Sequence, residues 1–248
     1  MTGRIQIVGM GPGSREMMTP QAAAVIAEAD VVVGYTVYVD LIRKSFPEKD
    51  TFTTPMRKEM ERCRKCYEFA MKGKNVAMLC SGDAGVYGMA SPVLSLGEEF
   101  PEVDVEIVPG ITAANSGAAV LGAPLNHDYC VISLSDLLTP GSVIEKRIRC
   151  AIQGDFALAI YNPSSRKRAD YLKRAVDIMM SEGAASDRAC GYVMNIGRAG
   201  TQAVTCTLAQ LREASVDMFT TVFVGNSQTV IRNGKMITPR GYRGDGNE

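Results

Sequence analysis

The stretch IQIVGMGPG, residues 5–13, decides the fold of this chain. Its first four residues form a mostly apolar run that is typical of a buried strand, and three glycines in the next five residues predict a loop directly after it. A helical run follows over residues 20–29. A strand, a glycine loop and a helix in this order are typical of an α/β fold.

The same alternation continues along the first half of the chain. We expect strands over residues 31–33, 75–80 and 103–108 and helices over residues 86–96 and 113–121, with small-residue loops at 81–85 and 109–112. Short apolar strands that alternate with helices predict a parallel sheet. In such a sheet ligands bind beyond the carboxyl ends of the strands, which is where three of these loops lie.

The second half of the chain has a different pattern. The sequence Gly122-Ala123-Pro124 predicts a hinge, and strands are predicted over residues 129–132, 156–160, 191–194, 203–205 and 220–224, helices over 142–152 and 167–181, and a hairpin over 230–237. The close run of strands after residue 190 predicts a mixed sheet. We therefore expect two α/β domains, 1–121 and 122–240, with a cleft between them and a frayed tail over 241–248.

Composition limits the partners of the protein. Among 248 residues the 27 Lys and Arg balance the 27 Asp and Glu, so no global charge favours nucleic acid or an anionic membrane as a partner. Without an 18-residue apolar run or a signal segment we expect a cytoplasmic protein. Seven cysteines without the spacing of a disulfide framework are expected to be reduced thiols.

Cys63 and Cys66 form a lone CxxC pair in a charged helical stretch. A tetrahedral metal site needs further ligands, and the chain has neither a second pair nor more than one histidine. We therefore predict no metal site and favour cysteines that pack in the core, although a role for the pair stays open.

The glycine loop at residues 9–13 does not fit a dinucleotide site. The dinucleotide motif needs its third glycine one residue later and an acidic residue at the end of the second strand, where Gly34 and Tyr35 stand instead. Pro12 removes one N–H from the loop, and no GxxxxGK[ST] motif occurs. The loops therefore suit a ligand without phosphates; S-adenosylmethionine is compatible with them, but the residues alone do not select it.

Six segments carry a resemblance to a known family. VGMGPG (8–13), CSGDAGVYGMA (80–90) and VPGITAANSGAA (108–119) together resemble the tetrapyrrole methyltransferase superfamily. GAPLNHDYCVISLSDLLTP (122–140), AIYNPSSRKR (159–168) and TTVFVGNSQT (220–229) resemble one branch of it, the C17-methyltransferases of precorrin-3B or cobalt-factor III. One departure is Ala84, where related enzymes often have a proline after the loop aspartate.

This resemblance implies a function and a set of cofactor contacts. The family consists of homodimers that use S-adenosylmethionine to methylate C17 of a corrin precursor, with ring contraction, in cobalamin biosynthesis. The cofactor contacts that the resemblance carries over to this chain are Gly82, Asp83, Val86, Tyr87, Thr112, Ala113, Tyr161, Asn162, Met194, Asn195, Thr220 and Thr221.

Catalysis places different demands on the residues. Methyl transfer requires alignment of the reactants and exclusion of water, whereas ring contraction requires the loss of a hydroxyl proton to a nearby base. His127 is the candidate base, with Asp128 to orient it and Asp136 as a further candidate. Alternatively, His127 only hydrogen-bonds the start of the following strand and Asp136 only accepts a bond beside a helix.

The substrate of such an enzyme carries several carboxylates, which arginines bind well. Arg166 and Arg198 are the candidates in the second half, with Arg57 in the first, although charged residues at helix ends are often only solvated. Pro12, Ser133 and Ser135 are also expected on the substrate side of the cleft.

The same residues bear on three other functions. Another methyltransferase of the superfamily is the nearest alternative, and the segments at 127–140 and 161–168 argue against it. The fold alone also permits a non-catalytic nucleotide-binding module. A nicotinamide-dependent oxidoreductase is disfavoured by the incomplete glycine motif.

Overall fold

The computed structural model describes residues 2–165 and 169–241. The chain forms two compact units, Met1–Ala113 and Ala114–Glu248. Each unit is an α/β structure, as the alternation of strands and helices predicts. The domain boundary at residues 121 and 122 and the cleft stay predictions.

The first unit is built on a five-stranded sheet with the order β3-β2-β4-β1-β5. All four strand pairs are parallel, which confirms the predicted parallel sheet. The elements are β1 (Arg4–Gly9), η1 (Arg15–Met17), α1 (Pro20–Glu28), β2 (Val31–Tyr35), α2 (Thr36–Ile42), β3 (Thr51–Thr54), α3 (Glu59–Ala70), β4 (Val76–Cys80), α4 (Ala90–Leu96), η2 (Gly97–Glu99) and β5 (Asp104–Val108).

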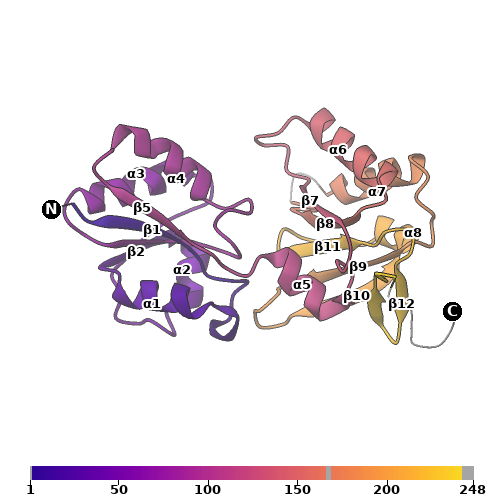
Figure 1. Ribbon diagram of the computed structural model, residues 1–248, viewed down its shortest axis with the longest axis horizontal. Coiled ribbons are helices and arrows are strands. Elements are labelled where there is room, and N and C mark those ends of the chain that lie inside the picture. The colour runs from indigo at the N-terminus through magenta and orange to yellow at the C-terminus, as the bar shows by residue number, and fades with distance from the viewer. Residues whose placement is uncertain (1, 166–168, 242–248) are drawn as a thin grey trace. The chain divides into compact units, whose positions relative to one another are not determined.

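Helices cover both faces of this sheet, as Figure 1 shows. On one face α3 and α4 pack against the strands through a core that includes Cys66, Tyr67 and Val93. On the other face α1 and α2 pack through a core that includes Ile26 and Val39. Burial on both faces explains why β1, β2 and β4 are apolar along most of their length rather than alternating.

The second unit has a mixed five-stranded sheet with the order β10-β9-β11-β8-β7. Only the pair β7 and β8 is parallel, so the predicted mixed sheet is confirmed. The elements are α5 (Ala113–Leu121), β6 (Gly122–Ala123), β7 (Tyr129–Ser133), α6 (Gly141–Gln153), β8 (Ala157–Tyr161), α7 (Tyr171–Ser181), β9 (Ala189–Met194), β10 (Gln202–Thr207), α8 (Leu208–Arg212), β11 (Thr220–Val224), β12 (Val230–Arg232) and β13 (Lys235–Ile237).

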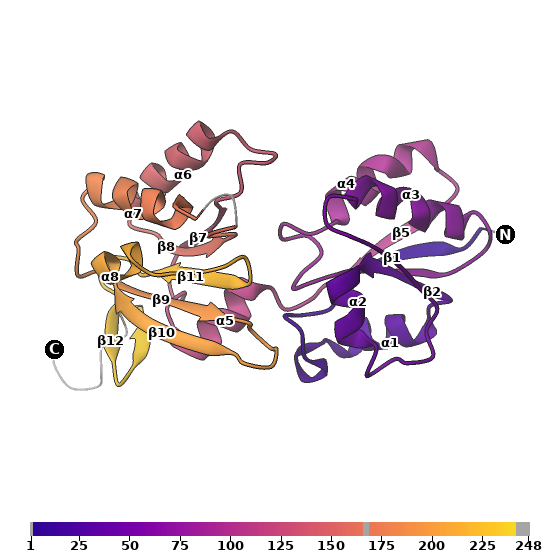
Figure 2. The ribbon, with the colours of Figure 1, turned by 180° about the vertical axis from the view of Figure 1, so that it is seen from behind.

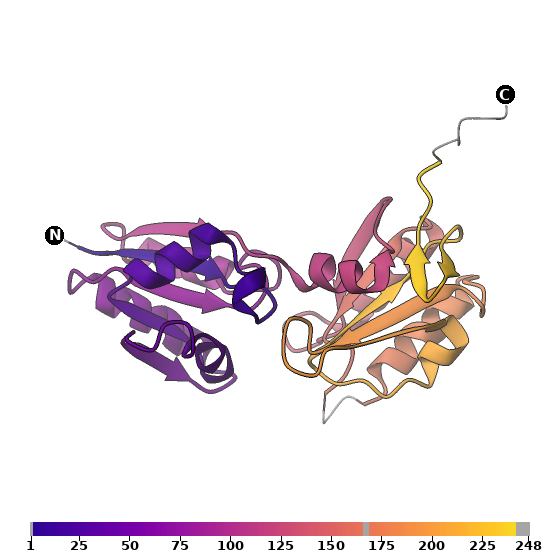
Figure 3. The same cartoon turned by 90° about the horizontal axis from the view of Figure 1, so that it is seen from below.

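Helices α6 and α7 lie on one face of this sheet and α5 on the other (Figure 2). Gly117 allows α5 to approach closely, because a Cβ there would lie 2.8 Å from an atom of the Phe223 ring. The hairpin β12–β13, yellow in Figure 3, pairs with β6 to form a small third sheet. The Thr238 hydroxyl fixes this sheet by donating to the carbonyl of Pro124 at 2.6 Å.

Some elements differ from the prediction. Helix α4 begins at Ala90 rather than near residue 86, because the preceding residues form a turn in which Tyr87 adopts a positive φ of 53°. α2, β3 and α8 were not predicted; α2 and β3 are short and rich in β-branched residues, which give no clear helical or strand period.

Candidate functional site

The loops after β1 and β4 are joined at the carboxyl edge of the first sheet. The Gly11 N–H donates to the Gly82 carbonyl at 3.1 Å, and the Gly82 N–H donates to the Gly11 carbonyl at 2.7 Å. Both residues have positive φ, 74° and 68°, a conformation that favours glycine. The bridge uses the N–H groups that a phosphate would need, so this edge suits a ligand without phosphates.

Glycine is also required where the β5 loop meets these two loops. A Cβ on Gly110 would lie 2.2 Å from the Gly82 carbonyl oxygen and 2.4 Å from the Gly9 carbonyl oxygen. A Cβ on Gly9 would lie 2.7 Å from the Gly110 nitrogen. The three loops therefore pack backbone against backbone, which explains why each of the three quoted N-terminal motifs contains glycine at this point.

Asp83 ties two of the loops together. One carboxylate oxygen accepts from the Gly85 N–H at 2.8 Å within its own loop, and the other accepts from the Gly110 N–H at 2.9 Å. Ala84, which replaces the proline of related enzymes, is buried, and its carbonyl accepts from the Ala90 N–H at 3.1 Å. The carboxylate and the start of α4 therefore hold the loop in place without the proline.

Tyr87 is the most unusual residue of this loop. Its positive φ of 53° is rare for a bulky side chain, and the side chain is 58% exposed. Strained backbone of this kind is often found in ligand sites. Val86 is half-buried beside it, and Thr112 and Ala113 are half-buried at the end of the β5 loop.

In the second unit, strand register brings several predicted residues to one edge of the sheet. Ser133 pairs with Tyr161 across β7 and β8, and Met194 pairs with Thr220 across β9 and β11. Thr221 follows in β11 and, like Thr220, is buried. This edge is the carboxyl end of β7, β8 and β9, so the structure brings together residues that the resemblance assigned to one ligand.

The loops that leave this edge are tightly bonded. Asn162 has a positive φ of 52°, and its amide donates to the Ser133 hydroxyl at 2.9 Å. The same hydroxyl accepts from the Ser135 N–H at 3.2 Å. Asn195 also has a positive φ of 52°, and its carbonyl accepts from the Thr201 hydroxyl at 2.8 Å. The two loops thus present defined backbone positions rather than a loose surface.

Tyr161 has a fixed hydroxyl. Its oxygen accepts from the Ala114 N–H at 2.7 Å, in the first turn of α5. This N–H has no partner within a helix, because the first four N–H groups of an α-helix never do. Tyr161 therefore fixes the start of α5 against the end of β8.

His127 and Asp128 lie at the opposite edge of this sheet. They precede the first residue of β7, whereas Ser133 is its last residue, about 16 Å away at the usual rise along a strand. The Asp128 N–H donates to His127 Nδ1 at 2.8 Å, and both side chains are largely exposed. The structure therefore does not bring these two candidates to the strand ends where the other predicted residues gather.

Asp136 lies beyond the carboxyl end of β7 and accepts from the Tyr171 hydroxyl at 2.5 Å. It lines a cavity of about 150 Å³ whose other walls come from α6 and α7, with Ile144, Ile148 and Ile178 among them. Asp136 therefore lies beside α6 and α7.

Besides Ser133 and Ser135, the predicted substrate-binding residues belong to different loops of the two units. Arg198 lies in the turn between β9 and β10, with its guanidinium 5.3 Å from the centre of the Phe219 ring. Pro12 is buried in the glycine loop of the first unit. Arg166 lies outside the described residues.

The CxxC pair is part of the core. Cys63 and Cys66 are both fully buried on α3, and burial raises the pKa of Cys63 to about 11 and that of Cys66 well above its ordinary value. A protonated buried thiol is a poor nucleophile and a poor metal ligand. Within residues 2–165 and 169–241 no group of three or more His, Cys, Asp or Glu could hold a metal ion, and no helix there is long and apolar enough to cross a bilayer.

One residue escaped the sequence analysis. Arg62 lies inside the first unit, with 5% of its surface exposed, whereas the candidate Arg57 is exposed. It falls on the same buried stripe of α3 as Cys63 and Cys66. A charged residue on an apolar stripe was the available signal, because burial of a charge is costly without partners.

Comparisons with known proteins bear on the family of this chain. A family model described as tetrapyrrole (corrin/porphyrin) methylases matches residues 4–212. A probable cobalt-factor III C(17)-methyltransferase of Salmonella typhimurium is 45% identical over 96% of this chain and 99% of that protein. The cobalamin biosynthesis protein CbiHC of Archaeoglobus fulgidus is 44% identical over 97% of this chain, which spans 53% of that protein.

A solved structure is similar over the same length. The crystal structure of the methyltransferase CobJ superposes with a TM-score of 0.87 at 36% identity and covers 96% of this chain and 100% of that one. Sequence and structure thus confirm the resemblance that the six quoted segments carry. The chain therefore belongs to the tetrapyrrole (corrin/porphyrin) methylases.

Proposed function

We propose that this protein transfers a methyl group from S-adenosylmethionine to C17 of cobalt-factor III, with contraction of the ring, in cobalamin biosynthesis. The observation that carries the proposal is the 45% identity to the Salmonella typhimurium protein over nearly the whole of both chains. That relative is described as acting on cobalt-factor III, which favours this substrate over its metal-free counterpart, precorrin-3B.

The hydrogen-bonding groups of the loops in the first unit fit S-adenosylmethionine. The Gly11–Gly82 bridge engages two backbone N–H groups that a nucleotide phosphate would need, while the cofactor has no phosphate. Asp83 and the backbone carbonyls around it supply acceptors for ribose hydroxyls and an ammonium group. We therefore propose Gly82, Asp83, Tyr87 and Thr112 as cofactor contacts in this unit.

The edge of the second sheet is proposed to take part in the same binding. Its candidate contacts are Tyr161, Asn162, Met194, Asn195, Thr220 and Thr221. Tyr161, Met194, Thr220 and Thr221 lie on neighbouring strands at one edge, and Asn162 and Asn195 follow β8 and β9 directly, each with a positive φ of 52°. Polar side chains gathered at one edge in this way can bind the polar groups of a ligand.

S-adenosylmethionine, when bound, supplies an electrophilic methyl group on a sulfonium. The residues of this chain hold the reactants in line and exclude water, which can account for a large part of the rate of a displacement. Rigid glycine junctions and the doubly bonded Asp83 carboxylate serve this purpose because they fix the loop before a ligand arrives.

We also propose that the protein acts in the cytoplasm as a homodimer. The resemblance to homodimeric enzymes supports the second point. Light scattering on the purified protein tests the second: a mass near twice that of the chain supports it, and the monomer mass contradicts it.

The activity is tested by following S-adenosylhomocysteine release with cobalt-factor III and, in parallel, with precorrin-3B. The proposal expects turnover of cobalt-factor III and a product heavier by one methyl group. Turnover of precorrin-3B alone would assign the metal-free substrate instead. Binding of S-adenosylmethionine without turnover of either compound would leave a methyltransferase of the same family with another substrate.

A further inference from the structure

A cavity of about 220 Å³ lies within the first unit, at the carboxyl ends of β2 and β4. After β2 the chain enters α2 on one face of the sheet, and after β4 it leads to α4 on the other face. Neighbouring strands whose chains diverge in this way leave a crevice where ligands bind. Between β4 and β1 the same divergence is closed by the bridge of Gly11 and Gly82.

The wall of this cavity combines aromatic and sulfur-containing side chains with one buried cation. Tyr35 and Tyr38 pack edge to face, with ring centroids 5.1 Å apart, and Met56 and Tyr87 also line the space. Arg62 reaches it from α3. Glu59 also lines the cavity, so two charged groups lie among apolar and aromatic side chains, and a few polar groups in such a wall are typical of small-molecule sites.

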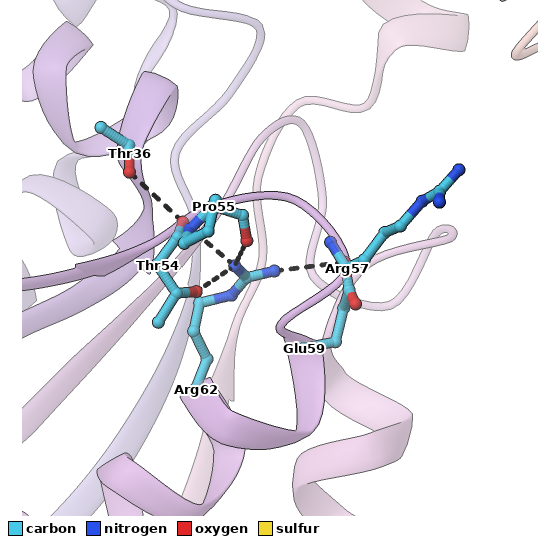
Figure 4. Close-up of polar contacts among 6 residues, drawn as sticks. All are labelled: Thr36, Thr54, Pro55, Arg57, Glu59 and Arg62. Carbon is cyan, nitrogen blue, oxygen red and sulfur yellow. Dashed lines mark hydrogen bonds and ion pairs between the residues drawn. The ribbon is translucent and has the colours of Figure 1, made fainter.

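The guanidinium of Arg62 is held mainly by neutral oxygens (Figure 4). Nη1 donates to the Thr54 hydroxyl at 2.5 Å and to the Pro55 carbonyl at 3.2 Å. Nη2 donates to Glu59 Oε1 at 3.4 Å, and the Glu59 side chain is 45% exposed. This ion pair is longer than the 2.7–2.9 Å range, roughly, of a strong charge-assisted bond, so the buried cation is only weakly compensated.

Glu59 has a second contact that does not need its charge. Oε1 also accepts from the Arg57 N–H at 3.1 Å, across a turn in which Arg57 has a positive φ of 69°. The Arg57 side chain itself points away from the cluster (Figure 4). The position of Glu59 shows that a carboxylate can lie beside the Arg62 guanidinium. The Glu59 carboxylate itself is too far away, at 3.4 Å, to form a strong ion pair there.

We infer that Arg62 binds a peripheral carboxylate of the tetrapyrrole substrate and that this carboxylate takes the place of Glu59 on the guanidinium. The inference rests on the proposed function, because the proposed substrate is the ring that carries the carboxylates. The cavity holds an acid side chain rather than the whole macrocycle, with the tyrosines and Met56 against its apolar part. Tyr87 lines the same cavity, so the carboxylate bound by Arg62 would lie next to the loop that is proposed to bind S-adenosylmethionine.

A matched pair of variants tests this inference. Glu59→Gln removes the competing charge but keeps an oxygen for the Arg57 N–H, and Glu61→Gln removes the same charge two residues later, where Glu61 pairs with Lys58 on the surface. The Kd of cobalt-factor III is measured by absorbance titration in the presence of S-adenosylhomocysteine. We expect Glu59→Gln to lower that Kd about twofold to fivefold relative to Glu61→Gln.

Arg62→Lys is the complementary variant, since it keeps the charge and loses the planar fork. We expect it to raise the Kd of cobalt-factor III about tenfold while the affinity for S-adenosylhomocysteine stays unchanged. If the Arg62→Lys variant does not fold, the comparison of Glu59→Gln with Glu61→Gln is sufficient to test the inference. Equal affinities of Glu59→Gln and Glu61→Gln would overturn the inference and leave Arg62 as a structural residue. Failure of the unaltered protein to bind cobalt-factor III would instead refute the proposed function.

Discussion

Gly11 and Gly82 exchange two backbone hydrogen bonds, with N···O distances of 3.1 and 2.7 Å, between loops that follow different strands of one parallel sheet. Parallel strands do not pair beyond their ends, so this antiparallel bridge is an extra junction at the edge where ligands bind. In this chain the glycine motif joins two loops, in contrast to the phosphate-binding role of glycine motifs in dinucleotide sites.

The backbone junction predicts a strong effect of a single methyl group. Gly110→Ala places a Cβ 2.2 Å from the Gly82 carbonyl oxygen, so backbone must move. We expect the free energy of unfolding to fall by about 1–3 kcal/mol, measured by urea denaturation. Gly141→Ala is the control, because a Cβ at the start of α6 meets nothing within 4 Å, and its effect should stay within about 0.5 kcal/mol. Equal effects of the two changes would contradict the close packing of the loops.

Asp83 supports the same loops through its charge. Asp83→Asn leaves one oxygen for two backbone N–H groups, so either Gly85 or Gly110 loses its acceptor. We expect the affinity for S-adenosylhomocysteine, measured by calorimetry, to fall about tenfold. Asp104→Asn, at an exposed position at the start of β5, serves as the control for charge alone. An unchanged affinity in the Asp83 variant would remove this residue from the proposed site.

His127 lies away from the gathered residues, and this placement makes a sharp prediction. His127→Ala should leave kcat for formation of the ring-contracted product within about twofold and should not alter its pH profile, because the side chain is exposed at the opposite strand edge. Steady-state kinetics between pH 6 and 8, roughly the range in which histidine titrates, measures both quantities. A fall in kcat of about a hundredfold or more would instead support His127 as the base.

The buried thiols predict a pH dependence of stability. Burial raises the pKa of Cys63 and of Cys80 to about 11, whereas an unfolded cysteine titrates near about 8.5. The folded state therefore keeps protons that the unfolded state loses, so this stabilisation is complete below about pH 8.5 and is lost as the pH rises toward 11. Urea denaturation between about pH 8 and 10 should show falling stability.

Variants separate the thiols from other alkaline effects. Cys63→Ala should make that fall less steep, by up to about 1.4 kcal/mol per pH unit for one thiol. Cys150→Ser, at an exposed position, should not change the slope. The same slope in both variants would show that the burial of Cys63 does not contribute.

The general fold could be predicted because its signals are local. The apolar runs at 5–8 and 220–224 and the helical run at 113–121 coincide with β1, β11 and α5. The short α2 could not, because its TVYVDLI sequence has the composition of a strand, and its contacts with β2 and the core residues around Val39 outweigh that propensity.

The site was less accessible to sequence reasoning. Glycine spacing indicated the loops but could not show that Gly11 bonds to Gly82, because that contact joins two distant segments. His127 was favoured by its chemistry, while only the strand register shows which edge it occupies. Arg62 lies in a charged stretch of the sequence, so its place on one stripe with Cys63 and Cys66 is a weak signal of burial, and the packing of α3 shows that the residue is buried.

The position of the transferred methyl group tests the central claim most directly. The purified protein is incubated with cobalt-factor III and S-adenosylmethionine carrying a carbon-13 methyl, and the product is examined by NMR. The account predicts one labelled methyl, attached to C17. A label on any other ring carbon, or a product without label while S-adenosylmethionine is bound, would contradict it.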